Sequence, residues 1–379
     1  MRQAMIQRTG EYEKYLQRNV LGDYYLYTFT PRPLMEGEFF KLDEELSAML
    51  IKTHRQLGIL EGMMKHLPNN AIIQNFMIIK ESYFSRLIDY NGVPFASALK
   101  AIGMDKEELP ELKNIVSAYQ CSLNNSVSSI TLSRICTVAL YGHDAPVKIS
   151  ERKDAVVWDR VVTPWEAYNP TVPERILPAL ADISAFLRND EVSDILIKTA
   201  LVHYQFEMIH PYECYNGIVG RMMFPMILHE YGIKAGLLIG LSEFLYHNKN
   251  SYFETLRTTQ YSGGYIALIK FFVQGIYESA KRASKQIEML TQIITEDEKK
   301  IKSLGSSVKR TLAVYNHFKA YIFSEIRTVA DDLDVSFNTI SKSVHALCEL
   351  DILQIEKKQS RHRVFVYGRL LDILSRQSN

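Results

Sequence analysis

The chain has 379 residues, enough for two or three domains with sizeable cores. Charged residues make up 23% of it and apolar ones 47%, as in ordinary globular proteins. The formal net charge of +1 gives no overall attraction to nucleic acid or to an anionic membrane, so any nucleic-acid surface has to be local. No apolar run approaches the roughly 20 residues that cross a bilayer, and no membrane contact is expected.

Cysteine usage and the N-terminal residues indicate the cellular compartment in which the protein is expected. The four cysteines (Cys121, Cys136, Cys214 and Cys348) have neither the paired spacing of a metal site nor the density of a disulfide framework. Residues 1–18 are polar and charged, and they lack the apolar centre of a signal peptide. Both observations predict a cytoplasmic protein with reduced thiols.

The first 140 residues are dominated by helical spacing of apolar side chains. This spacing predicts helices over 42–66 and 71–90 and further helix within 108–140. The turn at 89–92 ends the second of these helices.

Residues 154–175 differ in composition from the helices around them. They contain β-prone residues among several prolines, which predicts a small hairpin or an extended flap. Its core is Val156, Val157 and Trp158. Trp158 could equally anchor a core.

The next segment joins two helices through a short polar turn. A strongly apolar helix is predicted over 193–209, and it runs directly into His210. After the turn, Asn216 and Gly217 open a helix that extends to Tyr231. This layout of base, turn and helix start suits phosphate chemistry.

Three features of this segment favour that chemistry. A neutral His210 can accept a proton from an attacking hydroxyl. The backbone N–H groups of Asn216, Gly217 and Gly220 lie near a helix start, where an anion is stabilised. Arg221, about one turn further on, can donate to a phosphate oxygen. The alternative is that His210 and Pro211 merely end a core helix and that Asn-Gly is a turn.

A long helix and a separate C-terminal segment complete the chain. Helical spacing covers about 264–303, and 305–307 supplies a hinge. Residues 308–370 have the pattern helix, helix, helix and two strands, with Thr328 as a cap, 337–350 as the third helix and strands at 353–355 and 364–366. This is the layout of a winged helix-turn-helix.

A winged helix of this kind would present polar and basic side chains to DNA. The residues expected to bind DNA are Asn338, Thr339, Lys342, Lys357, Lys358, Arg361 and Arg363. The nearby Asp331, Asp332 and Asp334 would weaken binding, and winged helices also serve as protein-interaction and dimer modules. DNA binding and a homodimer are therefore both open.

The stretch 210–221, His-Pro-Tyr-Glu-Cys-Tyr-Asn-Gly-Ile-Val-Gly-Arg, resembles the signature loop of the Fic (Fic/Doc) family. Residues 206–209, 241–252 and 31–68 resemble further parts of the larger Fic proteins. The resemblance implies a protein AMP-transferase, in which His210 deprotonates a protein hydroxyl that attacks the α-phosphate of ATP. It also implies Mg²⁺ held by an acid, and Val156, Val157 and Trp158 as a flap that positions the target peptide.

Three residues depart from the family pattern. Cys214 stands where the family has the metal-binding acid, and a thiol is a poor ligand for Mg²⁺. Tyr215 replaces a glycine, and Ile218 replaces the first arginine. We therefore expect weak or altered activity, with the metal ligand missing.

Residues 85–90 resemble the inhibitory helix motif of the same family. Ser85 is its hydroxyl residue, and Asp89 takes the place of its glutamate with one fewer methylene. A carboxylate on Arg221 would exclude a nucleotide phosphate. The alternative is a solvated carboxylate at a helix end.

The predicted organisation is mainly α-helical, with three parts. Residues 1–110 form a helical regulatory region, 111–304 the Fic core and 305–379 the winged helix. The expected function is AMP transfer from ATP to an unidentified target protein. The rival hypotheses are transfer of another phosphate-containing group, and a non-enzymatic regulator that joins a degenerate Fic core to a DNA-binding module.

Overall fold

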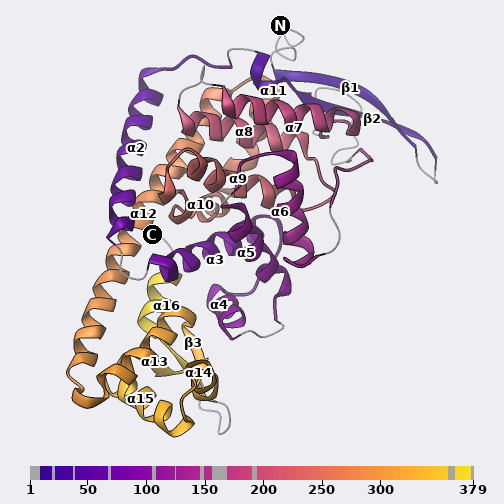
Figure 1. Cartoon of the computed structure of the whole chain (residues 1–379). Helices are drawn as coiled ribbons and strands as arrows, with labels where there is room; N and C mark the ends of the chain where they lie inside the picture. The colour runs from indigo at the N-terminus through magenta and orange to yellow at the C-terminus, as the bar shows by residue number, and fades with distance from the viewer. Residues whose placement is uncertain are drawn as a thin grey trace.

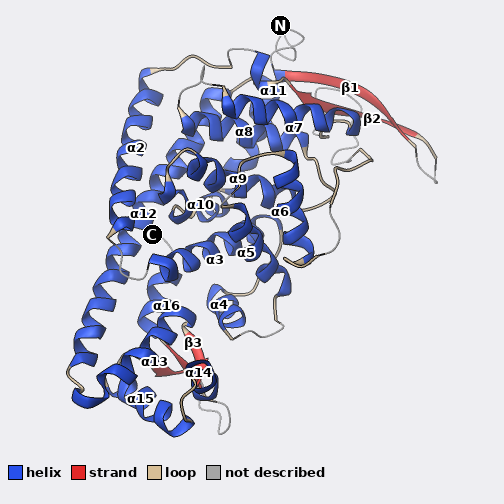
Figure 2. Ribbon diagram, viewed as in Figure 1, coloured by secondary structure: helices blue, strands red, loops and turns tan. Residues whose placement is uncertain are grey.

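The computed structural model describes residues 9–18, 22–36, 39–66, 70–104, 108–123, 125–145, 149–155, 169–189, 194–356 and 363–376. Most of these residues are helical (Figure 1). Strands form a long hairpin at one end of the molecule and a small sheet near the C-terminus (Figure 2). The predicted mainly α-helical class is confirmed. No helix within the described ranges is long and apolar enough to pass through a membrane.

Helices and one hairpin make up the first half of the chain. In order, the elements are β1 (Gly10–Gln17), β2 (Tyr24–Pro31), η1 (Leu34–Glu36), α2 (Glu44–Lys65), α3 (Asn70–Asp89), α4 (Phe95–Gly103), α5 (Pro110–Ser122), α6 (Ser129–Tyr141) and α7 (Pro173–Arg188).

The second half contains the central helices and the C-terminal elements. In order, they are α8 (Ile195–Ile209), α9 (Asn216–Glu230), η3 (Lys234–Leu238), α10 (Leu241–His247), α11 (Lys249–Ser262), α12 (Tyr265–Lys302), η4 (Gly305–Ser307), α13 (Val308–Tyr321), β3 (Phe323–Glu325), α14 (Ile326–Leu333), α15 (Phe337–Glu349), β4 (Gln354–Ile355), β5 (Val364–Val366) and α16 (Gly368–Ser375).

Helix α8 is the centre of the fold. Every one of its residues is buried, which explains why apolar side chains occur on all of its faces. Asp194 caps its start by accepting hydrogen bonds from the backbone N–H groups of Leu196 and Ile197. Helices α7, α9 and α12 pack around α8. The core therefore holds the end of α8, at His210, in a fixed position.

Helix α12 links this core to the C-terminal elements. It packs along α2 and α8 in its first half and contacts α13 and α16 further on (Figure 1). Its buried residues recur every three or four positions, as an apolar stripe requires.

The hairpin β1–β2 is the main difference from the prediction for the N-terminal region, which was helical throughout. The two strands pair antiparallel, with Gly10 opposite Pro31 and Gln17 opposite Tyr24. The signal is present in the sequence, because residues 24–30 consist almost entirely of β-prone tyrosine, threonine and phenylalanine.

The C-terminal module, residues 308–356 and 363–376, largely follows the predicted order. Helix α15 and strands β4 and β5 lie where the sequence placed them. A further strand, β3, was not predicted and pairs with β5. Thr328 is not a helix cap, because α14 starts at Ile326, as soon as the chain leaves β3. The winged-helix interpretation stays a prediction.

Candidate active site

His210 ends helix α8 in a left-handed conformation, with φ 49° and ψ 64°. Its backbone N–H still donates to the carbonyl of Phe206, at 2.9 Å, so the turn closes tightly. Burial and, to a lesser extent, the nearby Arg152 lower the pKa of His210 to about 3. The imidazole is therefore neutral at physiological pH, as a proton acceptor must be.

Arg152 fixes the backbone on both sides of His210. Its backbone N–H donates to the carbonyl of Pro211, at 2.8 Å, and its Nε donates to the carbonyl of His210, also at 2.8 Å. The guanidinium also donates to the carbonyls of Ile209, Thr171 and Asp154. Only 4% of Arg152 is exposed, so this buried cation satisfies the open carbonyls at the end of α8.

The turn after His210 is closed by Asn216. Its side-chain oxygen accepts a hydrogen bond from the backbone N–H of Tyr212, at 2.8 Å, and its amide donates to the carbonyl of Tyr212, at 2.7 Å. The Asn216 side chain thus shapes the turn. The first backbone N–H groups of α9, at 216–218, have no partner within the helix and can bind an anion.

Arg221 is buried and points toward α3. Its Nε donates to the hydroxyl of Ser85 at 2.9 Å, and its Nη2 donates to the carbonyl of Ser85 at 2.9 Å and to Asp89 at 2.5 Å. Burial alone would lower the pKa of Arg221, but the Asp89 carboxylate raises it above its usual range. Asp89 therefore reaches Arg221 despite its shorter side chain.

Gly217 makes room for this ion pair. A Cβ at position 217 would lie 2.8 Å from a guanidinium nitrogen of Arg221 and 3.0 Å from an oxygen of Asp89. The glycine of the Asn-Gly pair is thus explained by close approach and not by backbone conformation, because its φ is not positive.

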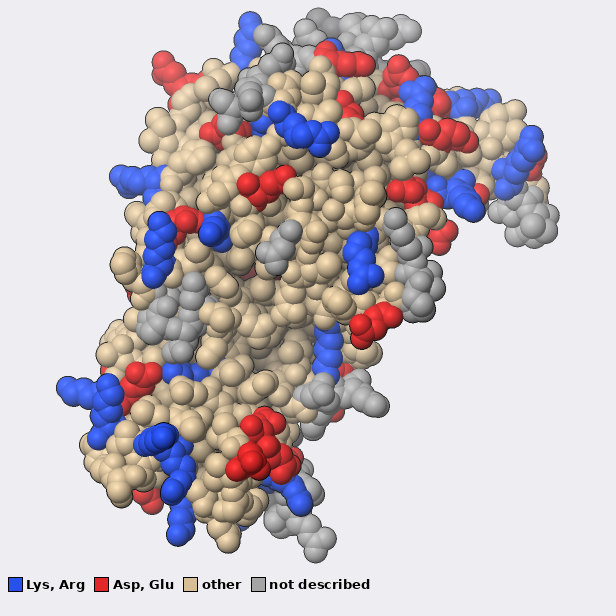
Figure 3. All heavy atoms as spheres, in the orientation of Figure 1, with Lys and Arg blue, Asp and Glu red and all other residues tan. Residues whose placement is uncertain are grey.

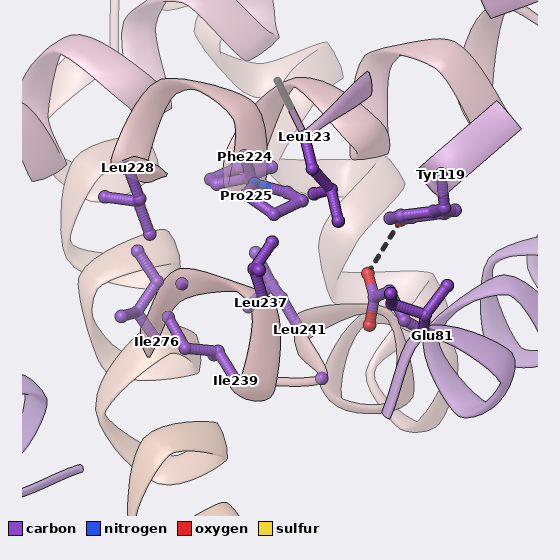
Figure 4. A pocket seen from close by; sticks show the side chains of 13 residues that line it. Glu81, Tyr119, Leu123, Phe224, Pro225, Leu228, Leu237, Ile239, Leu241 and Ile276 are labelled. Carbon is purple, nitrogen blue, oxygen red and sulfur yellow. Dashed lines mark hydrogen bonds between the residues drawn. The ribbon is translucent and has the colours of Figure 1, made fainter. Parts of the chain in front are cut away.

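Polar contacts in the interior hold α3 in place. The buried Glu81 accepts a hydrogen bond from the hydroxyl of Tyr119, at 3.0 Å (Figure 4). It also accepts one from the backbone N–H of Ser242, at 3.0 Å. Burial raises the pKa of the Glu81 carboxyl. Beside it, Glu243 lies 3.0 Å from Lys80 and 3.0 Å from Arg282. These contacts fix the helix that carries Asp89 against α5, α10 and α12.

The elements above enclose a cleft of about 520 Å³. It is lined by Asp89, Tyr90, Glu207, His210, Glu213, Cys214, Tyr215, Asn216, Gly217, Arg221, Phe253 and Leu256. His210, the start of α9 and the buried Arg221 therefore line one cavity.

Glu207 is a buried carboxyl in the wall of this cleft. It lies one turn before His210, and its Oε1 is 3.9 Å from Nε2 of the fully buried His203. A Cβ at Gly220 would lie 2.4 Å from the Glu207 carboxylate, which explains the glycine at that position. Burial raises the pKa of Glu207 to about 7.

The three departures from the signature pattern occupy different environments. Cys214 is exposed as a residue. Partial burial of its thiol and the neighbouring Glu213 raise the pKa of that thiol, which disfavours a nucleophilic thiolate. Tyr215 adopts a left-handed φ of 60°, which favours glycine, and its ring packs edge-on against Tyr90. Ile218 is fully buried in the core and does not line the cleft.

The carboxylates that line the cleft are Asp89, Glu207 and Glu213, and none of them stands at position 214. In the ranges that the structure describes, no three His, Cys, Asp or Glu side chains are grouped to hold a metal ion. Asp89 is engaged with Arg221, and position 214 offers sulfur where Mg²⁺ prefers oxygen.

The remaining predicted residues are placed as follows. Asn338 and Lys342 are exposed on α15, Thr339 is half-buried, and Arg363 is exposed beside β5. The flap residues Val156, Val157 and Trp158 and the wing residues Lys357, Lys358 and Arg361 lie outside the described residues. Arg152 and the role of Asn216 in shaping the turn were missed. No sequence signal marks Arg152, because its partners are carbonyls distant in the chain.

Comparison with known proteins finds similarity over the segment that holds this site. Residues 150–228, which hold Arg152 and the whole 210–221 segment, match the Fic/DOC family model. A probable protein adenylyltransferase of Aquifex aeolicus (strain VF5) is 25% identical over 152 residues. That match covers 40% of this chain and 43% of the relative, so the chain spans less than half of the relative's length.

Two solved structures resemble the whole fold or much of it. A Fic family protein from Desulfovibrio desulfuricans G20 superposes with a TM-score of 0.56 at 15% identity, covering 88% of this chain and 98% of that one. A Fic domain containing signaling protein from Bacteroides thetaiotaomicron VPI-5482 has a TM-score of 0.48 at 13% identity, covering 63% of this chain and 98% of that one. The first of these structures shows that the chain has the Fic fold, and residues 150–228 match the Fic/DOC family model.

Proposed function

We propose that this protein binds a nucleotide in the 210–221 cleft and transfers AMP from ATP to a hydroxyl of a target protein, and that Asp89 restrains this activity. The observation that carries the proposal is the convergence of His210, the start of α9 and Arg221 on one cavity, with Asp89 bound to Arg221. The Aquifex relative, named as a probable adenylyltransferase, supports the same reaction class.

In the proposed reaction the target hydroxyl attacks the α-phosphorus of ATP. A new P–O bond forms, the bond between the α-phosphorus and the bridging oxygen breaks, and pyrophosphate leaves. The hydroxyl proton passes to His210, which is neutral and can accept it. The N–H groups that open α9 stabilise the phosphate charge.

Asp89 restrains the reaction by occupying Arg221. The guanidinium donates to Ser85 and Asp89, and the Asp89 carboxylate repels an incoming phosphate. A hydrogen bond to a charged group contributes about 1.5–3 kcal/mol, which corresponds to roughly 10- to 100-fold in affinity. We expect Asp89→Ala to raise nucleotide affinity and label transfer by that factor.

The metal chemistry of the family does not fit this cleft, so no step is routed through Mg²⁺. Cys214→Asp supplies an oxygen ligand at an exposed position that already lines the cleft. We expect this variant, on the Asp89→Ala background, to gain divalent-cation dependence.

The test uses α-labelled ATP with a cell extract as the source of targets. The proteins compared are the unmodified chain, Asp89→Ala, Asp89→Ala with His210→Ala, and Asp89→Ala with Cys214→Asp. Glu111→Ala is the matched control. Glu111 lies in α5 and pairs with Arg86 of α3, the helix that carries Asp89, but it does not line the cleft. Label that requires His210 and rises only with Asp89→Ala supports the proposal. Calorimetry that detects no ATP binding to any variant would contradict it.

A second candidate function is DNA binding by the C-terminal module. Helix α15 exposes Asn338 and Lys342 while Ile340, Val344 and Leu347 pack inward, as a recognition helix requires. On the visible face of this module a group of acidic side chains lies beside several basic ones (Figure 3). A salt titration with duplex DNA decides the matter, because a slope near zero excludes phosphate contacts.

A further inference from the structure

Helix α4 lies between the ion pair of the cleft and the C-terminal module. It follows α3 after the short segment 90–94, and it contacts β3 and α16 on its other side (Figure 1). The chain therefore runs from Asp89, through one turn and one helix, to the module.

The segment between α3 and α4 is held firmly. The hydroxyl of Tyr83 donates to the carbonyl of Val93 at 2.9 Å, and Arg86 donates to the carbonyl of Asn91 at 2.6 Å. Phe95, the first residue of α4, packs against Tyr83 with ring centroids 5.0 Å apart. The last turns of α3 therefore contact both the connecting segment and the start of α4.

The other end of α4 abuts the module directly. A Cβ at Gly103 would lie 2.6 Å from the backbone carbonyl oxygen of Tyr321, closer than two such atoms can approach. Lys100 forms an ion pair with Glu356, which follows β4. Glycine at 103 is thus required by close packing of α4 on the end of α13.

The contact point in the module carries backbone strain. Ile322, next to Tyr321, has φ 63° and ψ −49°, a conformation that β-branched residues rarely adopt. It is fully buried, its N–H donates to Phe318 at 2.9 Å, and its carbonyl accepts from Tyr367 at 2.9 Å. Strain of this kind persists only where surrounding contacts impose it, and it is found at switch regions.

We propose that α4 couples the C-terminal module to the Asp89–Arg221 pair, so that a shift of the module at Ile322 changes how firmly Asp89 is held on Arg221. The effector is whatever binds the module. The effect on activity rests on the proposed function, but the coupling itself does not. Because coupling is reciprocal, breaking the ion pair must also alter the module at its contact with α4.

Hydrogen–deuterium exchange of the full-length protein tests the coupling without nucleotide. Gly103→Ala forces α4 away from Tyr321, and we expect exchange of the peptide 85–92 to rise at least about fivefold, the lower end of typical allosteric coupling. Gly62→Ala is the matched control, since Gly62 lies in α2 and a Cβ there would meet nothing. Asp89→Asn should in turn accelerate exchange at 318–325.

A milder perturbation covers the case in which Gly103→Ala fails to fold. Glu356→Gln removes only the charge of the ion pair with Lys100, and we expect a rise of roughly two- to fivefold at 85–92. The proposal is overturned if these variants change exchange at 95–104 and 318–325 but leave 85–92 as in the unmodified protein. It is also overturned if Gly62→Ala has the same effect as Gly103→Ala. Label transfer is measured separately, so failure of the proposed reaction and failure of the coupling are distinguishable.

Discussion

The cleft and the exposed face of α15 both carry polar side chains that the sequence singles out, yet the two regions are constrained differently. In the cleft, Asn216 and Arg221 are buried, and their side-chain donors and acceptors have partners inside the protein. On α15, Asn338 and Lys342 are exposed and contribute little to packing. A buried polar group without a partner costs about 1–3 kcal/mol. The paired polar residues of the cleft are therefore needed for folding, whether or not the cleft carries out a reaction. Only binding can preserve the surface face.

The largest effect is expected from placing a charged side chain at a core position next to the cleft. Ile218 replaces an arginine of the family pattern but is fully buried. We expect Ile218→Arg to lower the free energy of unfolding by about 4 kcal/mol or to prevent folding, because it buries an unpaired charge. Urea unfolding measures this, with Ile218→Val as the control at about 1 kcal/mol. A stable Ile218→Arg protein would show that the side chain can turn into the cleft.

Arg152 tests whether a buried cation near the site is structural. Arg152→Ala leaves several carbonyls at the end of α8 without a donor, and we expect a loss of about 3 kcal/mol in urea unfolding. Arg175→Ala is the comparison, because Arg175 is partly exposed and pairs with Glu11 and Glu13 at the surface. Its loss should stay below about 1 kcal/mol. Equal effects of the two substitutions would contradict the contrast between buried and exposed polar groups.

The pH dependence of stability reports on the buried titratable groups of the cleft. Burial lowers the pKa values of His203 and His210 to about 3, so the folded state binds fewer protons there, and stability falls as pH drops from 6.5 toward 3. Burial raises the pKa of Glu207 to about 7, so its contribution has the opposite sign and falls as pH rises through 4.5 to 7. Between pH 4.5 and 6.5 we expect Glu207→Gln to steepen the acid-induced loss by up to about 1.4 kcal/mol per pH unit. Parallel curves for the two proteins would indicate an ordinary carboxyl at 207.

The smallest effect is expected on the exposed face. Lys342→Ala should change the free energy of unfolding by no more than about 0.5 kcal/mol, since the side chain is exposed. If the module binds DNA, the same substitution should reduce the salt slope of binding by about 1. A large stability loss would mean that Lys342 has a structural partner, and the contrast with the cleft would disappear.

Local sequence patterns predicted most of the helices and the meeting of His210 with Arg221. These features depend on the spacing of apolar residues and on a short turn, both of which are encoded within a few residues. Helices α3, α8, α12 and α15 follow the predicted limits closely. The hairpin β1–β2 was not predicted, because residues 1–110 were expected to form a helical region.

Contacts between distant segments were harder to predict. The side chain of Arg152 donates to carbonyls up to 58 positions away, and no residue type or spacing marks such contacts in one sequence. The pairing of Asp89 with Arg221 bridges 132 positions, and only the family resemblance suggested it. Asp89 is one methylene shorter than the glutamate of the family motif. Whether it could reach Arg221 therefore depended on the placement of α3. That placement is set by the buried Glu81 and Lys80 contacts.

The length of α12 determines where the protein can be divided. At 38 residues the helix is about 57 Å long, and Gln286 already donates to the carbonyl of Ile373 in α16. Asp297 accepts hydrogen bonds from Tyr367 and Arg369. A chain that ends near 305 would lack the C-terminal module, which packs on the C-terminal half of α12. Leu290, Ile294 and Ile301 would then be exposed to water. Such a fragment should aggregate, so the part that contains the cleft has to be separated by a cut inside the helix, before residue 286.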